Sequence, residues 1–191
     1  MIFLISIILI TFFHEFSHLI AAKIFQCDVK VFSIGFGKKI WSKKIGKTEY
    51  KICPLLLGGY CKLESELEDT KNIYSFSNLS YTKKIIISLA GITINIVMGL
   101  ITLYLGNHYY SYNLLYFGFM SLTLGLFNLI PFIPCLDGGY VFFIPILYNI
   151  YGQEVGLQIF KKWVEKSYSI IMIINILFLP YLLWLLITGK I

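Results

Sequence analysis

Residues 2–25 read IFLISIILITFFHEFSHLIAAKIF, and this stretch decides the class of protein. It is apolar almost throughout, and as one helix it is long enough to cross the roughly 30 Å hydrocarbon core of a bilayer. Near its middle it carries His14, Glu15 and His18, which are costly at membrane depth unless a metal, a partner or water compensates them. The sequence therefore predicts a membrane-spanning helix that carries a polar functional site.

The segment His14-Glu15-Phe16-Ser17-His18 is an H-E-x-x-H motif. Residues four apart lie on one face of a helix, so His14 and His18 can present two imidazoles to one Zn²⁺. Glu15 lies about 100° around the helix. Its predicted role is that of a general base, which accepts a proton from the water that attacks a peptide carbonyl. A chance match on a solvated surface is the alternative, and the apolar surroundings argue against it.

A third metal ligand is required, because catalytic zinc usually takes three protein ligands and keeps one position open. The candidates are His108 and Asp137. We expect His108 in a short connection across the membrane from the motif, where a surface histidine is the better interpretation. Asp137 lies between Pro131 and Gly138-Gly139, where we expect a broken helix, which is tolerated at membrane depth when it lines a cavity. Asp137 is the predicted ligand, and a turn-forming aspartate is the alternative.

The rest of the chain continues the membrane pattern. Only 14% of its 191 residues are charged, whereas about 25% is usual in a soluble domain. We therefore expect an all-α polytopic membrane protein, formed by a single domain over residues 1–191, with a short re-entrant or interfacial helix at residues 140–150. The expected transmembrane helices are about four in number and cover residues 2–25, 85–106, 112–134 and 168–188.

A different pattern fills residues 27–64, between the first two expected spans. Apolar and polar side chains partly alternate over residues 29–36 and 48–53, and glycines punctuate the segment. This pattern predicts short strands that form a small β-hairpin region.

The charge distribution indicates how the chain is oriented. All 16 basic residues are lysine and the net charge is +6. The lysines gather at residues 30–84 and 161–166, where they would flank membrane spans, so we do not predict nucleic-acid binding. The connection at residues 107–111 has no lysine. The positive-inside rule then places the lysine-rich segments in the cytoplasm, both termini outside, and the site open toward the cytoplasm.

Together these motifs resemble the site-2 protease family of intramembrane zinc metalloproteases. That family combines H-E-x-x-H in a first core helix with an L-D-G element in a third, which here are residues 14–18 and Leu136-Asp137-Gly138. Residues 32–37 and 57–60 are similar to the family's strand and membrane-dipping β-loop. In size the chain resembles the compact bacterial members, including the sporulation-type proteases.

Two further segments carry the resemblance. Ala90-Gly91 with Asn95 is similar to the family's A-G-P-x-x-N motif, with Ile92 in place of Pro, and residues 128–131 are similar to the start of its N-x-x-P segment. The resemblance implies that Asn95 and Asn128 bind the substrate backbone near the metal, where Asn95 could steady an oxyanion. An interhelical hydrogen bond is the alternative for Asn95. Gly91 and Gly99 lie four residues to either side of Asn95, a spacing typical of close helix packing.

The segment around Gly58 and Gly59 is the other candidate for substrate binding. A transmembrane peptide must unwind before hydrolysis, and its freed backbone groups must then be satisfied. An exposed strand edge at these glycines would do so by strand addition. A purely structural hairpin is the alternative, since strand edges are often covered.

The resemblance implies a zinc-dependent intramembrane endopeptidase of the cell membrane, which cleaves transmembrane or membrane-associated peptides and has regulatory membrane partners. An intramembrane metal transporter is a second hypothesis, but a transporter would be expected to show inverted repeats, and the sequence shows none. The third hypothesis is a proteolytically inactive relative that binds membrane peptides, and the intact motif argues against it.

Overall fold

The computed structural model describes residues 2–65, 71–131, 133, 136–152 and 154–167. The chain divides into two compact units, Met1–Ile130 and Pro131–Ile191. The H-E-x-x-H motif belongs to the first unit and Asp137 belongs to the second.

The first helix, α1, covers Ile2–Ile24 and confirms the helix expected at residues 2–25. Two hydroxyl groups inside it are satisfied locally, because Thr11 Oγ1 donates to the Ile7 carbonyl at 2.7 Å and Ser17 Oγ to the His14 carbonyl at 2.6 Å. The helix ends in a Schellman turn. Gln26 takes the left-handed conformation at φ 57°, and the Cys27 amide donates to the Ala22 carbonyl at 2.8 Å.

Four strands follow α1 and form one mixed sheet. They are β1 (Val29–Phe36), β2 (Trp41–Ile45), β3 (Thr48–Ile52) and β4 (Leu55–Leu63). Their order is β2-β3-β1-β4, with β1 parallel to β3 and the other two pairs antiparallel. The strands expected at residues 29–36 and 48–53 are confirmed. The expected hairpin is only the β2–β3 part of a larger sheet, because β1 inserts between β3 and β4.

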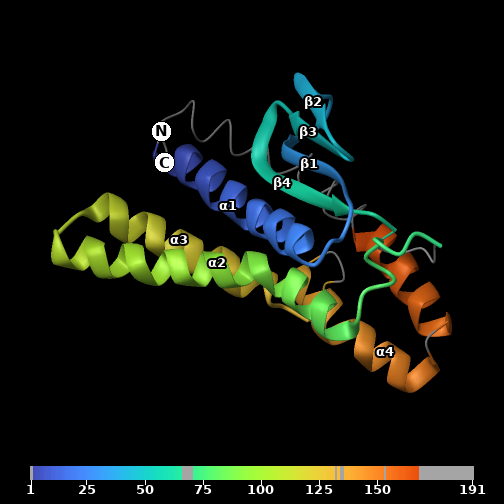
Figure 1. The fold of residues 1–191 in the computed structure, drawn as a ribbon. Coiled ribbons are helices and arrows are strands. Elements are labelled where there is room, and N and C mark those ends of the chain that lie inside the picture. The colour runs from blue at the N-terminus through green and yellow to red at the C-terminus, as the bar shows by residue number, and fades with distance from the viewer. Residues whose placement is uncertain (1, 66–70, 132, 134–135, 153, 168–191) are drawn as a thin grey trace. The chain divides into compact units, whose positions relative to one another are not determined.

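Helices α2 (Tyr81–His108) and α3 (Tyr112–Asn128) form an antiparallel pair (Figure 1). They approach closely at two glycines. A Cβ on Gly99 would lie 3.0 Å from the Gly118 carbonyl oxygen, and a Cβ on Gly118 would lie 2.9 Å from that of Gly99. Small residues of this kind let helix backbones pack tightly, so the packing role expected for Gly99 agrees with the structure.

The third span is shorter than expected. α3 has 17 residues and ends at Asn128, so the prediction of one helix over residues 112–134 is wrong at its C-terminal end. Pro131 explains the difference, since proline has no backbone N–H and disfavours helical conformation in the residue before it. Within the part of the chain that the structure describes, α1 and α2 are long and apolar enough to cross a membrane. The span expected at residues 168–188 lies outside the described residues.

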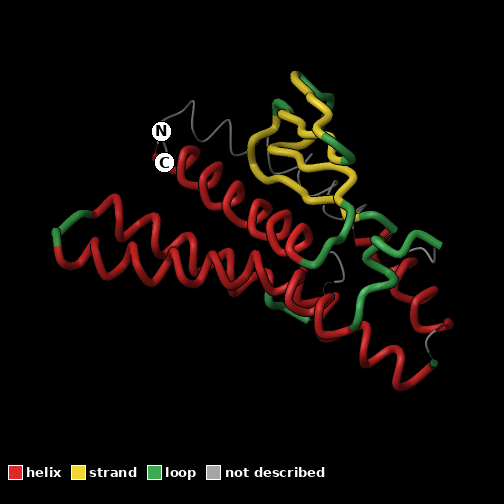
Figure 2. Tube along the Cα trace, in the orientation of Figure 1, coloured by secondary structure: helices red, strands yellow, loops and turns green. Residues whose placement is uncertain are grey.

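Within the first unit, α1 packs between α2 and the sheet (Figures 1 and 2). Strands β4 and β1 contact one side of α1, and α2 contacts the other. Ile10 and Ala22 are fully buried in this arrangement. The motif therefore lies inside the unit, and its surroundings come from segments that follow it in the chain.

In the second unit, Asp137 begins a helix that continues to residue 151. Its first turns include the π-helix η1 (Gly139–Phe143), and the rest is α4 (Ile144–Tyr151). The helix expected at residues 140–150 is confirmed. The broken helix expected around Asp137 is confirmed in part, because helical conformation ends at Asn128 and resumes at Asp137. Gly138 and Gly139 are themselves helical, so the glycines do not contribute to the break. Residues 154–167 are also helical, and Phe160 packs against the rings of Tyr140 and Phe143.

Candidate metal centre

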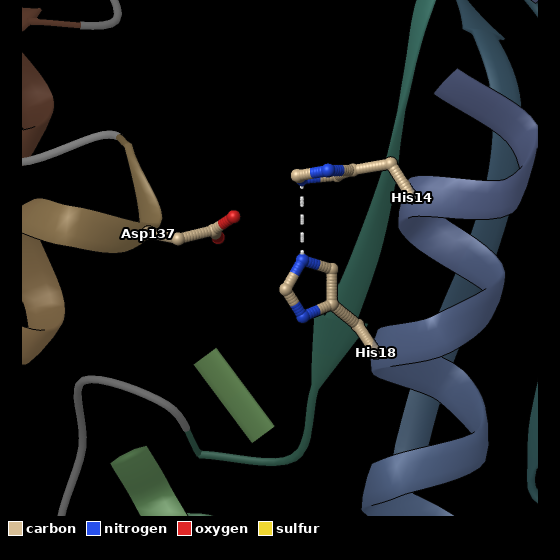
Figure 3. Close-up of side chains that lie close together, drawn as sticks. All are labelled: His14, His18 and Asp137. Atoms are coloured by element: carbon tan, nitrogen blue, oxygen red, sulfur yellow. Dashed lines mark hydrogen bonds between the residues drawn. The ribbon is translucent and has the colours of Figure 1, made fainter. Parts of the chain in front are cut away.

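The imidazoles of His14 and His18 project from adjacent turns of α1 toward the same space (Figure 3). Their Nε2 atoms are 3.3 Å apart, and both residues are 7% exposed. Two imidazole nitrogens that bind one tetrahedral zinc ion at ~2.0–2.1 Å lie roughly 3.3–3.4 Å from each other. The two rings thus lie on one face, as the four-residue spacing predicts, and at a separation that suits a shared zinc ion.

Helix α2 contacts the outer nitrogen of each ring. His18 Nδ1 is 2.7 Å from the carbonyl oxygen of Ile87. A carbonyl can only accept, so Nδ1 of His18 carries the proton and Nε2 keeps its lone pair. His14 Nδ1 is 3.1 Å from Nδ2 of Asn95 in a buried contact. Hydrogen bonds to the outer nitrogen orient a histidine ring for metal binding.

Gly91 lies between these two contacts, four residues from Ile87 and four from Asn95, on the same face of α2. A Cβ at this position would collide with Nε2 of His18 and would lie 2.6 Å from Nε2 of His14. A side chain here would therefore fill the space that both nitrogens face. Gly91 thus lets α2 lie close to both rings, and two imidazole nitrogens at this separation are ligands that zinc accepts, so the residues present fit zinc. This close approach of α2 to α1 at Gly91 agrees with the close helix packing that the spacing predicts.

Glu15 lies on the sheet side of α1 and is half-buried. Gly59 of β4 lies beside it, since a Cβ on Gly59 would lie 3.1 Å from Cγ of Glu15 and 2.6 Å from the carbonyl oxygen of Ser33. Gly58 faces a different neighbour, the ring of Phe36. The motif thus presents its two histidines to α2 and its glutamate to β4.

Strand β4 is at the edge of the sheet. Its inner side pairs with β1, with Gly59 opposite Ile34. Among the described residues, no strand pairs with its outer side. A strand edge of this kind can accept another extended chain.

The other residues that the sequence analysis considered for the site lie at helix ends or are buried between helices. Asn128 is the last residue of α3 and is half-buried, and Asp137 is half-buried at the start of its helix in the second unit. His108 is exposed at the end of α2 and stacks on Tyr104, as a surface histidine would. The amide of Asn95 makes an interhelical hydrogen bond, which was its alternative interpretation.

Two contributors could not be found from their residue types. Ile87 acts through its backbone carbonyl, which every residue supplies, so no sequence signal marks it. Ser121, fully buried on α3, donates to the carbonyl oxygen of Asn95 at 2.8 Å. Gly91 carried a signal for close helix packing, its four-residue spacing from Asn95, but none for its contact with the two rings.

A buried histidine pair with an adjacent glutamate on a long apolar helix defines a metallopeptidase type of site. Comparison with known families agrees, since the model of peptidase family M50 matches residues 2–114, more than half of the chain. The chain belongs to peptidase family M50, the site-2 protease family, and the resemblance seen in the sequence is thereby confirmed.

Several curated bacterial proteins are similar to this chain. One from Borreliella burgdorferi, named "Putative zinc metalloprotease", is 42% identical over 102 residues, which cover 48% of this chain and 24% of that protein. Proteins with the same description from Neisseria meningitidis and Campylobacter jejuni are 36% and 38% identical over 105 residues. These matches cover 52% and 50% of this chain and 23% and 28% of the two proteins. The matched part thus spans about a quarter of each relative.

Proposed function

We propose that this protein is a zinc-dependent endopeptidase of the cell membrane that cleaves transmembrane or membrane-associated peptides. The observation that carries the proposal is the facing pair of His14 and His18 beside Gly91, a position with no side chain. Membership of peptidase family M50 and the names of the similar bacterial proteins support the same reaction.

We assign the zinc ion to His14 and His18 of the first unit and to Asp137 of the second, the ligand set that the sequence predicts. Two imidazoles and one carboxylate are a set of ligands that catalytic zinc accepts, with a fourth position left open. When bound, zinc supplies Lewis-acid chemistry, because it lowers the pKa of water and polarises a carbonyl oxygen. Asp137 would contribute its carboxylate from the start of the helix in the second unit.

Glu15 is the proposed general base. Its carboxylate would accept a proton from the attacking water and pass it to the leaving amine. Its neighbour on the sheet side is the backbone of β4 at Gly59, with no side chain between them. A peptide bound along β4 would therefore lie close to this carboxylate.

Substrate binding is proposed at the outer edge of β4, with Gly58 and Gly59 at its centre. An unwound membrane peptide needs partners for its backbone N–H and C=O groups, and addition as a further strand would supply them. Asn128, at the end of α3, is proposed to bind the substrate backbone as well. Regulatory membrane partners remain part of the proposal.

The proposed topology is multi-pass, with the lysine-rich sheet in the cytoplasm, the site open to that side and both termini outside. Lysines at residues 38–51 support this orientation by the positive-inside rule. At the α2–α3 connection, Tyr109, Tyr110 and Tyr112 are 67%, 88% and 86% exposed. Exposed aromatic side chains of this kind gather at membrane–water interfaces, which fits the opposite surface of the bilayer.

The test uses the full chain in liposomes together with single-span peptide substrates. We expect cleavage that stops when a chelator removes the metal and returns when zinc is added back. Zinc flux across the liposome membrane is measured in parallel. Flux without any cleavage would contradict the proposal and favour the transporter hypothesis, and zinc binding without cleavage of any substrate would favour the inactive relative.

A further inference from the structure

The contacts around the two histidine rings form a directed series of hydrogen bonds. His18 Nδ1 donates to the Ile87 carbonyl, so Nε2 of His18 is an acceptor. Nε2 of His14, 3.3 Å away, is then the donor, and Nδ1 of His14 accepts from Nδ2 of Asn95 at 3.1 Å. In the arrangement of the structure, each of these contacts pairs one donor with one acceptor.

Metal binding through Nε2 requires the opposite role from Nδ1 of His14. A ligating nitrogen uses its lone pair, so the neutral ring carries its proton on the other nitrogen, which needs an acceptor. The Asn95 NH₂ group cannot accept, but the Oδ1 atom of the same amide can. A half-turn of the amide plane exchanges the two groups within the same space.

The Oδ1 atom of Asn95 is available for this task. Asn95 is 1% exposed, and over the described ranges no donor forms a hydrogen bond with its Oδ1. A buried amide oxygen without a donor is unfavourable by about 1–3 kcal/mol. A protonated His14 Nδ1 would give this oxygen the donor that it lacks.

Helix α3 holds Asn95 against the ring. Ser121 Oγ donates to the backbone carbonyl of Asn95 at 2.8 Å. A Cβ on Gly125 would lie 3.2 Å from Cβ of Asn95, so the glycine allows α3 to pack directly behind it. Asn95 is thus enclosed between α3 and His14, which is the place of a support and not of a substrate contact.

We propose that Asn95 is a positioning residue that selects the metal-binding tautomer of His14, by turning its amide so that Oδ1 accepts from Nδ1–H. This inference rests on the proposed function, because it assigns the support of the same metal ligand. It replaces the direct substrate contact that the family resemblance implies for Asn95.

The test is the zinc affinity of the purified full chain, measured in competition with a chromophoric chelator. Asn95→Leu keeps the approximate volume and removes the acceptor, so we expect zinc affinity to fall by ~10–100-fold, the usual effect of losing an outer-shell partner. Asn95→Asp presents only acceptors when ionised, so its affinity should equal that of the wild type or exceed it. Thr93→Val, at an exposed position of the same helix, is the matched control and should bind zinc as the wild type does.

The outcomes separate this inference from the proposed function. An unchanged zinc affinity in Asn95→Leu, with a raised KM for peptide, would overturn the inference and restore the substrate contact. If the leucine variant does not fold, Asn95→Asp tests the inference instead. A weaker zinc affinity in the aspartate variant than in the wild type would contradict an acceptor role for residue 95. A wild-type chain that binds no zinc would instead contradict the proposed function itself.

Discussion

Two glycines flank the motif, one on each side of α1, and the structure uses them differently. Gly91 of α2 faces the imidazoles of His14 and His18, whereas Gly59 of β4 faces the side chain of Glu15. On the α2 side, a backbone carbonyl and a buried amide contact the outer nitrogens of both rings. On the β4 side, the backbone of an edge strand lies next to the glutamate.

The difference teaches that metal binding and proton transfer depend on separate neighbours. The α2 side controls where the two imidazoles point, and so whether an ion is held. The β4 side controls what can lie beside Glu15, and so whether a peptide is cut. Substitutions on the β4 side should therefore lower turnover with zinc affinity retained, whereas substitutions on the α2 side should lower zinc affinity and, with it, turnover.

The largest effect is expected from Gly91→Ala. The added methyl group would occupy the space that both Nε2 atoms face, so zinc affinity should fall by on the order of 100-fold or more, beyond the loss of an outer-shell partner alone, and cleavage should stop. Chelator competition and a peptide assay measure the two quantities. Ala90→Gly, one residue away, is the control and should keep zinc. If Gly91→Ala binds zinc as tightly as the wild type does, the claim that the α2 side controls metal binding is wrong.

Glu15→Gln should separate the two functions most cleanly. The amide cannot accept the proton, so turnover should fall by about 10²–10⁴-fold, the usual contribution of a general base, while zinc affinity and thermal stability stay unchanged. The rate is measured at saturating zinc. Turnover close to that of the wild type would remove Glu15 from the reaction.

A smaller effect is expected from Gly59→Ala. Its methyl group would press on a backbone oxygen and on Glu15, neither of which can move aside freely, so turnover should fall by on the order of 10–100-fold with zinc affinity retained. Gly58→Ala is the matched variant, because its new neighbour is the ring of Phe36, which is 39% exposed and can rotate. Equal losses in the two variants would show that the contact with Glu15 does not matter.

The smallest effect is expected on the stability of the fold at acid pH, through the pair of Lys30 and Glu64 beside the sheet. A hydrogen bond from Lys30, and to a lesser extent one from Ser65, holds the pKa of Glu64 below its ordinary value, although partial burial opposes this. The lowered pKa stabilises the fold above the unfolded value of about 4.3, and this stabilisation is lost as the pH falls through the folded value. The Lys30 side chain is exposed and Glu64 is only half-buried, so solvent screens the pair and we expect a contribution of about 0.5 kcal/mol or less. Lys30→Met should weaken this acid sensitivity in thermal unfolding from pH 7 to 3, without changing zinc affinity; an unchanged pH profile would show that the pair contributes nothing.

The sequence predicts α1 and its motif because the information there is local. Apolar length sets the helix, and a four-residue spacing places His14 and His18 on one face. The neighbours of the motif depend on long-range pairing that no local pattern contains, such as β4 beside β1. Ile87 contributes only a carbonyl, and Gly91 looks like a packing glycine until its neighbours are known.

The incorrect boundaries also have physical reasons. Glycine lowers helix propensity by about 1 kcal/mol but does not forbid a helix, so Gly138 and Gly139 are helical where a break was expected. Pro131 has the stronger effect, and α3 ends three residues before it. The single domain, the fourth span at residues 168–188 and the roles of Asp137 and Asn128 stay predictions.

The most direct test of the metal centre is zinc-edge X-ray absorption spectroscopy on the zinc-loaded full chain. We predict two imidazole ligands, with the remaining ligands oxygen atoms at about 2.0–2.1 Å, and one imidazole fewer in His14→Ala. A sulfur shell at about 2.3 Å, which cysteine ligands would produce, or a spectrum without imidazole, would contradict the assignment of zinc to the paired histidines of α1.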